Sequence, residues 1–320
     1  MKINKAVIIG HSGHYSYALE SIKRNGIEIA AVSCMPDESN GNERLKKYLS
    51  DLGHDPEVFD DYITMLDTVK PDIAVINTMF HLNTDCAIEC IKRNINVFLE
   101  KPAALTFGKL NELKAVYKEN PHIHIAGMFG IRYDANFQTI KSRLPEIGKI
   151  RMITSQKSYK MGTRPEFYRH RKTYGGIIPW VAIHSIDWMT WLTGEKYLFV
   201  SALHSNEYNR NHGDMEVTSA ALYEMTNGII AAFNADMLRP ESAPSHGDDR
   251  VRIMGTNGVL ESINGRVTLN GSEIPLAPAI DIFDVFLNES AELSADDLFE
   301  STYAALLTRE SADKKLQLRF

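Results

Sequence analysis

The chain has 320 residues, 44% of them apolar, which suits about two domains, each with its own core. Its 35 lysines and arginines and 41 aspartates and glutamates are scattered and give a net charge of −6, which argues against nucleic acid or an anionic membrane as partner. No apolar run reaches the roughly 18 residues that span a bilayer, and no signal peptide or disulfide framework is evident. We therefore expect a soluble, cytoplasmic protein.

Short apolar strands alternate with helices through the first 126 residues. The expected strands cover 6–10, 29–33, 73–77, 96–100 and 123–126. Helices are expected from the loop after the first strand to residue 24, and at 44–52, 62–69, 84–93 and 107–120. This alternation predicts an α/β Rossmann domain at 1–126, with a doubly wound parallel sheet.

The pattern changes in residues 127–320. Helices are expected at 136–144 and 181–192, and strands at 150–155, 200–204, 217–223, 229–235, 251–254 and 267–269. Turns at Asn227-Gly228 and Asn257-Gly258 join neighbouring strands as hairpins. We expect an α+β domain with a large, mostly antiparallel sheet, and a final helix at 294–314 that packs back on the body.

A glycine loop of sequence GHSGHYS, residues 10–16, follows the first strand. Gly10 allows the tight turn, and the helix N-terminus from Ser12 to Ser16 offers N–H groups to a pyrophosphate. The alternative is an ordinary strand–helix turn that binds no nucleotide. The candidate cofactor-binding residues of this loop are Gly10, Ser12, Gly13, His14 and Tyr15.

The second strand ends where an acidic residue normally binds the ribose 2′-hydroxyl. Cys34 stands at that position, and Asp37 and Glu38 follow in the loop. A 2′-phosphate would require a basic residue, and Arg44 is distant in sequence. The cofactor is therefore expected to be NAD or NADP, with NAD favoured.

Glu100-Lys101-Pro102 directly follows a predicted parallel strand, at the sheet edge where α/β proteins bind ligands. A lysine there can hydrogen-bond a substrate hydroxyl and favour the alkoxide that develops as hydride leaves. Glu100 could fix that lysine or contact the nicotinamide ribose.

Several motifs occur in a characteristic order. They are the glycine loop, Asn77-Thr78 with Asn83, Glu100-Lys101-Pro102, Arg132-Tyr133, Gly148-Lys149-Ile150, Gly175-Gly176 with His184-Ser185-Ile186-Asp187, Asp214, and 255–260. In this order they resemble the glucose–fructose oxidoreductase / inositol dehydrogenase / MocA family over essentially the whole chain. The resemblance implies NAD(P)-dependent oxidation or reduction of sugars, polyols or related hydroxy compounds, and oligomerisation through the C-terminal sheet. It also implies cofactor contacts from Asn77, Thr78, Asn83 and Glu100.

The family's catalytic histidine matches His184, which the resemblance pairs with Lys101 on the reacting hydroxyl. An imidazole suits proton transfer at neutral pH, although a core histidine on an apolar helix is the alternative. The family's assisting aspartate, four residues earlier, is replaced by Trp180, which transfers no proton. Trp180 could instead stack on a sugar face, narrow the pocket or mark a lost activity.

The remaining substrate candidates are Arg132, Tyr133, Tyr168, Trp180 and Asp187, of which Asp187 more plausibly holds a nearby side chain than takes part in the chemistry. If arginines line the pocket, they favour a carboxylated sugar, because arginine binds carboxylates bidentately. A solvated loop is the alternative. No histidine or cysteine set has metal-ligand spacing, so no metal is expected.

Three functions remain open. The leading one is an NAD(P)-dependent dehydrogenase acting by hydride transfer. The second is NAD-assisted elimination or glycoside cleavage, and the third is a non-catalytic nucleotide- or sugar-binding regulator. For each of these functions we expect a small-molecule ligand and a homo-oligomeric protein.

Overall fold

The computed structural model describes residues 3–36, 38 and 40–320. The chain forms two compact units, one of Met1–Met128 with Asp281–Glu300 and the other of Phe129–Ile280 with Ser301–Phe320. The sequence suggests a single boundary near residue 127. It does not anticipate that a segment close to the C-terminus belongs with the first unit.

The first unit contains a six-stranded sheet of order β3-β2-β1-β4-β5-β6, parallel throughout. Its strands are β1 (Lys5–Ile9), β2 (Glu28–Ser33), β3 (Glu57–Val58), β4 (Ile73–Ile76), β5 (Asn96–Leu99) and β6 (Ile125–Gly127). The predicted doubly wound sheet is confirmed. The strand order reverses between β1 and β4, and ligands bind at such a point in open α/β sheets.

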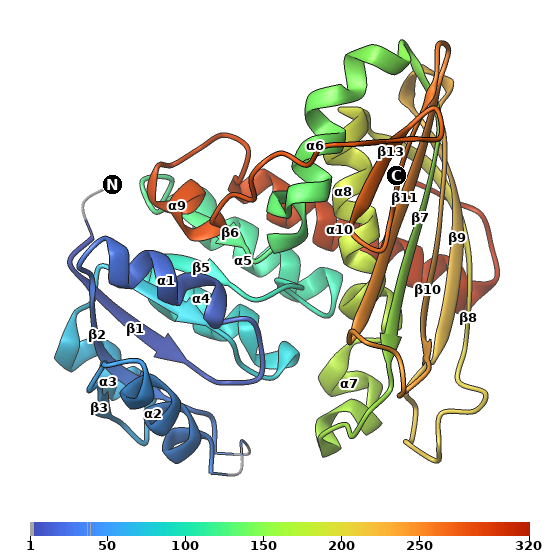
Figure 1. Ribbon diagram of the computed structural model, residues 1–320. Helices are drawn as coiled ribbons and strands as arrows, with labels where there is room; N and C mark the ends of the chain where they lie inside the picture. Colours follow the sequence, from blue (N-terminus) through green and yellow to red (C-terminus); the bar gives the residue numbers. More distant parts are fainter. Residues whose placement is uncertain (1–2, 37, 39) are drawn as a thin grey trace. The chain divides into compact units, whose positions relative to one another are not determined.

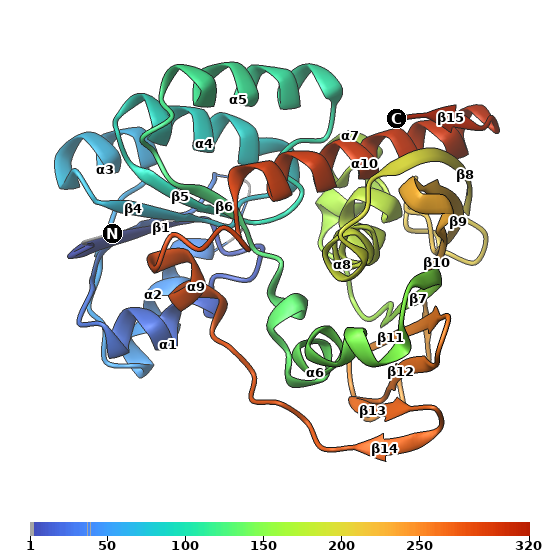
Figure 2. The ribbon, with the colours of Figure 1, turned by 90° about the horizontal axis from the view of Figure 1, so that it is seen from above.

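Helices cover both faces of this sheet. They are α1 (Ser16–Arg24), α2 (Gly41–Asp51), α3 (Tyr62–Val69), α4 (Asn83–Lys92), α5 (Phe107–Glu119) and α9 (Ile282–Leu287). Figure 2 shows α1, α2 and α9 on one face and α3, α4 and α5 on the other. The rings of Phe283 and Phe286, on α9, lie 5.2 Å and 5.3 Å from that of Phe98 on β5, and all three are buried. These contacts place α9 in the core of the first unit.

The second unit is built on a nine-stranded sheet of order β14-β13-β12-β11-β7-β10-β9-β8-β15. Its pairs are antiparallel apart from β7 with β10, as the sequence predicts for a mostly antiparallel sheet. The strands are β7 (Ile150–Lys160), β8 (Tyr197–Ser205), β9 (Thr218–Met225), β10 (Ile230–Arg239), β11 (Gly247–Gly255), β12 (Val259–Ile263), β13 (Arg266–Leu269), β14 (Ser272–Ile274) and β15 (Leu318–Arg319).

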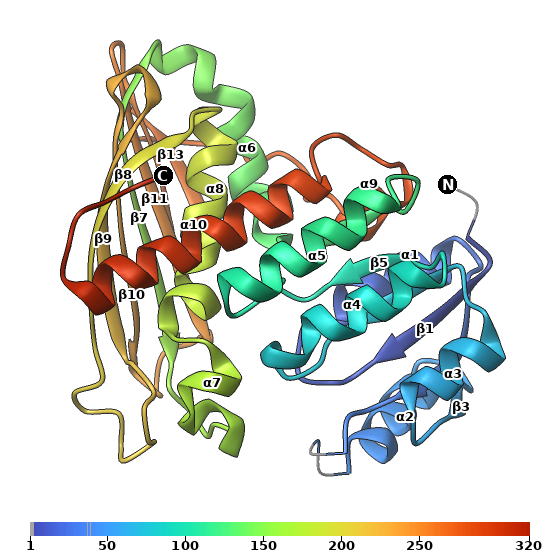
Figure 3. The same cartoon turned by 180° about the vertical axis from the view of Figure 1, so that it is seen from behind.

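The helices of the second unit lie along one face of its sheet. Figure 1 shows α6 (Ala135–Arg143) and α8 (Ile183–Thr193) on this face, with the short α7 (Arg171–Tyr174) below them. The C-terminal part of α10 (Ala295–Lys314) packs beside β8 and β9 (Figure 3). There Thr308 Oγ1 lies 2.9 Å from Tyr223 Oη, and Ser311 Oγ accepts the Ala202 N–H at 3.1 Å. The C-terminal part of α10 therefore packs on the sheet of the second unit.

The other face of the same sheet presents exposed apolar side chains. Side chains alternate along β9, so that Tyr223 is buried whereas Leu222 is 54% exposed. Leu203 on β8 and Ile230 on β10 are exposed on this face as well. Among the described residues no helix is long and apolar enough to cross a membrane.

Candidate functional site

The glycine loop lies tightly over the ends of β2 and β4. Gly10 has φ +77°, and a Cβ there would lie 2.6 Å from the Asn77 carbonyl oxygen, so only glycine fits without strain. The Gly10 N–H donates to the Ser33 carbonyl and the Ser12 N–H to the Asn77 carbonyl, both at 2.8 Å. The sequence-based role of Gly10 in the tight turn is thus supported by its geometry.

Two carboxylates engage further donors of this loop. Glu38 Oε1 accepts the His11 N–H at 3.1 Å and the Ser12 hydroxyl at 2.5 Å. Glu100 Oε2 accepts the His14 N–H at 2.9 Å and lies 2.7 Å from His14 Nδ1. Of the N–H groups from Ser12 to Ser16 that the sequence offers to a pyrophosphate, those of Ser12 and His14 thus have partners within the protein.

Glu38 follows the end of β2 and is the acidic residue that lies beside the glycine loop. Asp37 lies outside the described residues. The Glu38 side chain is 2% exposed, and its carboxylate also accepts the Met35 N–H at 2.8 Å. Burial acts to raise the pKa of Glu38, but hydrogen bonds from His11, Ser12 and Met35 outweigh it and lower this pKa below its ordinary value. The carboxylate is thus ionised near neutral pH. Burial together with the Glu38 charge raises the pKa of the Cys34 thiol to about 12.

Glu100 and Lys101 are both buried directly after β5, at the carboxyl edge of the parallel sheet. Lys101 Nζ lies 3.7 Å from Glu100 Oε1. Burial acts to raise the pKa of Glu100, but His14 and Lys101 outweigh it and hold this pKa below its ordinary value. The result is an ionised carboxylate between a histidine and an ammonium group.

Asn83, expected to contact the cofactor, holds the turn at Lys101 in place. Its Nδ2 donates to the carbonyl oxygens of Glu100 at 3.0 Å and Pro102 at 3.3 Å. Its Oδ1 accepts the Thr78 hydroxyl at 2.8 Å. Asn83 has no solvent exposure, so these contacts make it a positioning residue for the turn.

The Asn77 side-chain amide is a buried polar group beside the glycine loop. Among the described residues neither its Oδ1 nor its Nδ2 makes a hydrogen bond, and the residue has no solvent exposure. A Cβ on Gly13 would lie 2.9 Å from Asn77 Oδ1 and 2.7 Å from Glu100 Oε2. The missing side chain of Gly13 thus leaves this amide and the Glu100 carboxylate bordering the loop. A buried amide without a partner in the protein takes one from outside the chain, a water or a ligand.

In the second unit, α8 carries His184 and is anchored to β7. Trp188 Nε1 donates to Ser155 Oγ at 2.9 Å, and the hydroxyls of Ser155 and Ser185 lie 2.8 Å apart. His184 is 2% exposed and its ring meets that of Phe129 edge-on at 6.5 Å. Lys101 belongs to the first unit and His184 to the second.

A π-helical turn, Ile178–Ala182, precedes α8 and carries Trp180. The Trp180 ring lies 4.4 Å from that of Tyr168, and the Arg164 guanidinium lies over it at 5.0 Å. Burial lowers the pKa of Arg164, and among the described residues its buried Nε atom makes no hydrogen bond. Single π-helical turns occur frequently at functional sites.

Arg132 and Asp187 form a buried ion pair within the second unit. Arg132 Nε donates to Asp187 Oδ2 at 2.7 Å and Nη2 to Oδ1 at 2.5 Å, while Ser301 Oγ donates to Oδ1 at 3.1 Å. This bidentate pairing favours a structural role for both residues over contact with substrate. Tyr133 is buried too, and its carbonyl accepts the Ile280 N–H at 2.9 Å.

The contacts of His11 could not be predicted, since no sequence pattern distinguishes a site residue from a solvated one there. Glu38 could be predicted as a candidate, because it is an acidic residue within a few positions of the usual ribose-binding one. Arg164 is one of the arginines that the sequence offers for a substrate pocket, with a solvated loop as the alternative.

Two family sequence models match the chain. Residues 5–128 match the model described as "Oxidoreductase family, NAD-binding Rossmann fold", and residues 137–261 match "GFO/IDH/MocA C-terminal domain". Inositol 2-dehydrogenase of Salmonella paratyphi B (strain ATCC BAA-1250 / SPB7) is 26% identical over 175 residues, which are 54% of this chain and 49% of that protein. The chain thus spans about half the length of the curated relatives it matches.

Solved structures match over nearly the whole chain. A Thermotoga maritima protein assigned as an oxidoreductase is 40% identical, with a TM-score of 0.95 over 99% of this chain and 100% of that one. Myo-inositol 2-dehydrogenase from Lactobacillus plantarum shares the fold at 21% identity, with a TM-score of 0.77 over the full length of both chains.

Proposed function

Since this chain belongs to the GFO/IDH/MocA family of oxidoreductases, we propose that it is an NAD-dependent dehydrogenase of a sugar, polyol or related hydroxy compound. The observation that carries the proposal is the buried pair Glu100 and Lys101 at the carboxyl edge of a parallel sheet, beside the glycine loop. The inositol dehydrogenases among its relatives support the substrate class.

The residues of the first unit fit a nicotinamide dinucleotide. The family model of this unit is NAD-binding, and the Asn77 amide beside Gly13 is a buried donor and acceptor without a partner among the described residues. When bound, the cofactor supplies a nicotinamide ring that accepts or gives hydride. Gly10 lets the loop approach closely, Asn77 and Glu100 border it, and Tyr15 begins the helix beyond it.

Glu38 favours NAD over NADP in this proposal. An ionised carboxylate accepts hydrogen bonds from a ribose 2′-hydroxyl and repels a 2′-phosphate. Among the described residues the ion-pair partner of Glu38 is His11, so no lysine or arginine compensates its charge. Cys34 stands at the usual acidic position and cannot make this contact, and in the proposal Glu38 makes it instead.

Lys101 and His184 are proposed as the groups at the reacting hydroxyl. The Lys101 ammonium, held beside Glu100, donates a hydrogen bond to the substrate oxygen and stabilises its negative charge. His184 accepts the hydroxyl proton as general base and returns it in the reverse direction. Asn83 keeps the turn at Lys101 fixed while this charge develops.

The second unit is proposed to bind substrate through the Trp180 cluster, Arg164, Tyr168 and Trp180. Aromatic faces bind the apolar faces of sugar rings, and the Arg164 Nε atom is available for an acidic group on the substrate. We therefore favour a carboxylated sugar or polyol. Trp180, in place of the family's aspartate, acts by shape rather than by proton transfer.

A homo-oligomer through the C-terminal sheet is part of the proposal. The face of β8, β9 and β10 that exposes Leu203, Leu222 and Ile230 supports it, because contiguous exposed apolar surface marks protein interfaces.

The test measures NADH formation across a panel of polyols, aldoses and sugar acids. Lys101→Met is expected to lower kcat/KM about 10²–10⁴-fold, the usual contribution of such a group, and His184→Gln similarly. Lys118→Met changes an exposed lysine on α5 and serves as the matched control. If Lys101→Met keeps full turnover, the mechanism is wrong.

A non-catalytic regulator is the second candidate, favoured by Trp180 and by the two carboxylates that already engage loop donors. Calorimetry distinguishes the two functions. Nucleotide binding without turnover on the whole panel indicates the regulator, whereas turnover indicates the dehydrogenase.

A further inference from the structure

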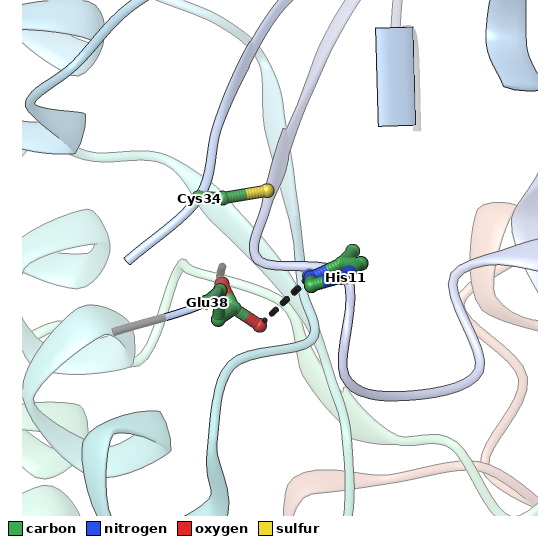
Figure 4. Close-up of side chains that lie close together, drawn as sticks. All are labelled: His11, Cys34 and Glu38. Carbon is green, nitrogen blue, oxygen red and sulfur yellow. Dashed lines mark hydrogen bonds and ion pairs between the residues drawn. The ribbon is translucent and has the colours of Figure 1, made fainter. Parts of the chain in front are cut away.

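Three side chains of different chemistry converge at one edge of the parallel sheet. One nitrogen of His11, the Cys34 sulfur and one Glu38 oxygen all lie within 4.8 Å of one another. His11 follows β1, Cys34 follows β2, and Glu38 stands just before α2. Figure 4 shows the three side chains around a common space, with the contact between His11 and Glu38. We propose that these residues bind a thiophilic divalent cation of the Zn²⁺ type.

The donor set selects this class of cation. Imidazole nitrogen, thiolate sulfur and carboxylate oxygen together suit Zn²⁺, whereas Mg²⁺ and Ca²⁺ prefer oxygen alone. Three protein ligands leave a fourth position of a tetrahedral site to water. The proposal revises the expectation of no metal site, because the ligands come from three loop positions and follow no sequence motif.

Glu38 is already held in place for this role. Its carboxylate accepts hydrogen bonds from the Ser12 hydroxyl and from the N–H groups of His11 and Met35, which fix its orientation before a cation binds. A cation would take the place of the contact between His11 Nδ1 and Glu38 Oε1, which measures 3.2 Å. Binding draws the three ligand atoms, which lie within 4.8 Å of one another, closer together.

Cys34 is similarly fixed by its surroundings. Its N–H donates to Asn42 Oδ1 at 2.7 Å, and a Cβ on Gly41 would lie 3.0 Å from its sulfur, so α2 packs closely against it. The thiol is buried beside the Glu38 charge, and a cation there would neutralise that charge. On binding, sulfur forms a bond to the metal and its proton passes to solvent.

The test uses Cd²⁺ and Zn²⁺ as probes of the whole chain. Cd²⁺ bound to a thiolate gives a charge-transfer absorption band in the ultraviolet, so titration of the protein should give this band with one equivalent. Cys34→Ser should abolish it, while the double variant Cys86→Ser/Cys90→Ser, which removes the two buried thiols of α4, should keep it. This readout requires no catalytic activity and is made without nucleotide, because the cation and the ribose proposed above would compete for Glu38.

Zn²⁺ affinity, measured by competition with a chromophoric chelator, gives the second readout. Glu38→Gln and His11→Ala should each weaken Zn²⁺ at least tenfold, and His11, only partly buried, is the substitution less able to disturb folding. Absence of the Cd²⁺ band, or a band that survives Cys34→Ser, would overturn the proposal. Equal Zn²⁺ affinity of His11→Ala and the wild-type protein would overturn it as well.

Discussion

The proposed preference for NAD over NADP rests on a single carboxylate, that of Glu38. Glu38→Gln removes the charge but keeps the side-chain shape. We expect NAD to bind about 10–100-fold more weakly, the equivalent of one lost charge-assisted hydrogen bond, while NADP binding holds or improves. Titration of both nucleotides measures this, with Glu43→Gln, an exposed carboxylate on α2, as control. An unchanged NAD-to-NADP ratio would remove Glu38 from cofactor recognition.

Glu100 should make stability depend on acid pH. Its pKa is lower in the folded protein than in the unfolded chain, so its contribution is present above the unfolded value of roughly 4.3 and is lost as pH falls through the folded value. Glu100→Gln is expected to destabilise the protein by about 1–3 kcal/mol at pH 7, with the difference shrinking below about pH 4. Thermal midpoints of both proteins across this range measure it. A constant difference would show that the charge of Glu100 is not involved.

A site residue could be predicted from the sequence only where its position after the end of a strand determines where it lies in the fold. Gly10 and Lys101 stand directly after strands, and strand ends are predictable. The partners of Asn83 and Arg132 are not, because a polar side chain can bind a cofactor or a neighbouring segment equally well. In the structure both are engaged by protein groups, Glu100 and Asp187.

At the scale of elements, the long alternating pattern of the first unit was predictable because each buried strand is a continuous apolar run. The edge strand β3 was not, since its two residues are exposed. In the second unit, β7 and β10 extend beyond their apolar segments into polar residues that their neighbours pair. Helix α9 has six residues, too few for a helical period to show in the sequence.

The pairing of Arg132 with α8 should stabilise the second unit. Asp187→Ala leaves a buried guanidinium without its carboxylate and is expected to cost about 3–5 kcal/mol. Urea denaturation measures the loss. The double variant Arg132→Met/Asp187→Leu removes both charges and should recover much of it. If Asp187→Ala is as stable as the wild-type protein, the pair has no structural role.

At the scale of the whole molecule, the exposed sheet face should control assembly. Leu222→Glu places a charge on this face and is expected to shift the proposed homo-oligomer to smaller species, because a buried unpaired charge is costly. Analytical ultracentrifugation measures the mass. Leu276→Glu, similarly exposed outside the strands, is the control. An unchanged mass for Leu222→Glu would place the interface elsewhere.

The α9 segment also bears on biosynthesis. Phe98 is translated long before Phe283 and Phe286, the rings that cover it, and Asp284, on the same helix, accepts a hydrogen bond from Ser21 on α1. At roughly 5–20 residues per second, the ribosome needs on the order of ten seconds or more between them. During that interval the nascent first unit exposes the apolar surface that α9 later covers. A fragment cut at residue 128 would stay in that unfinished state.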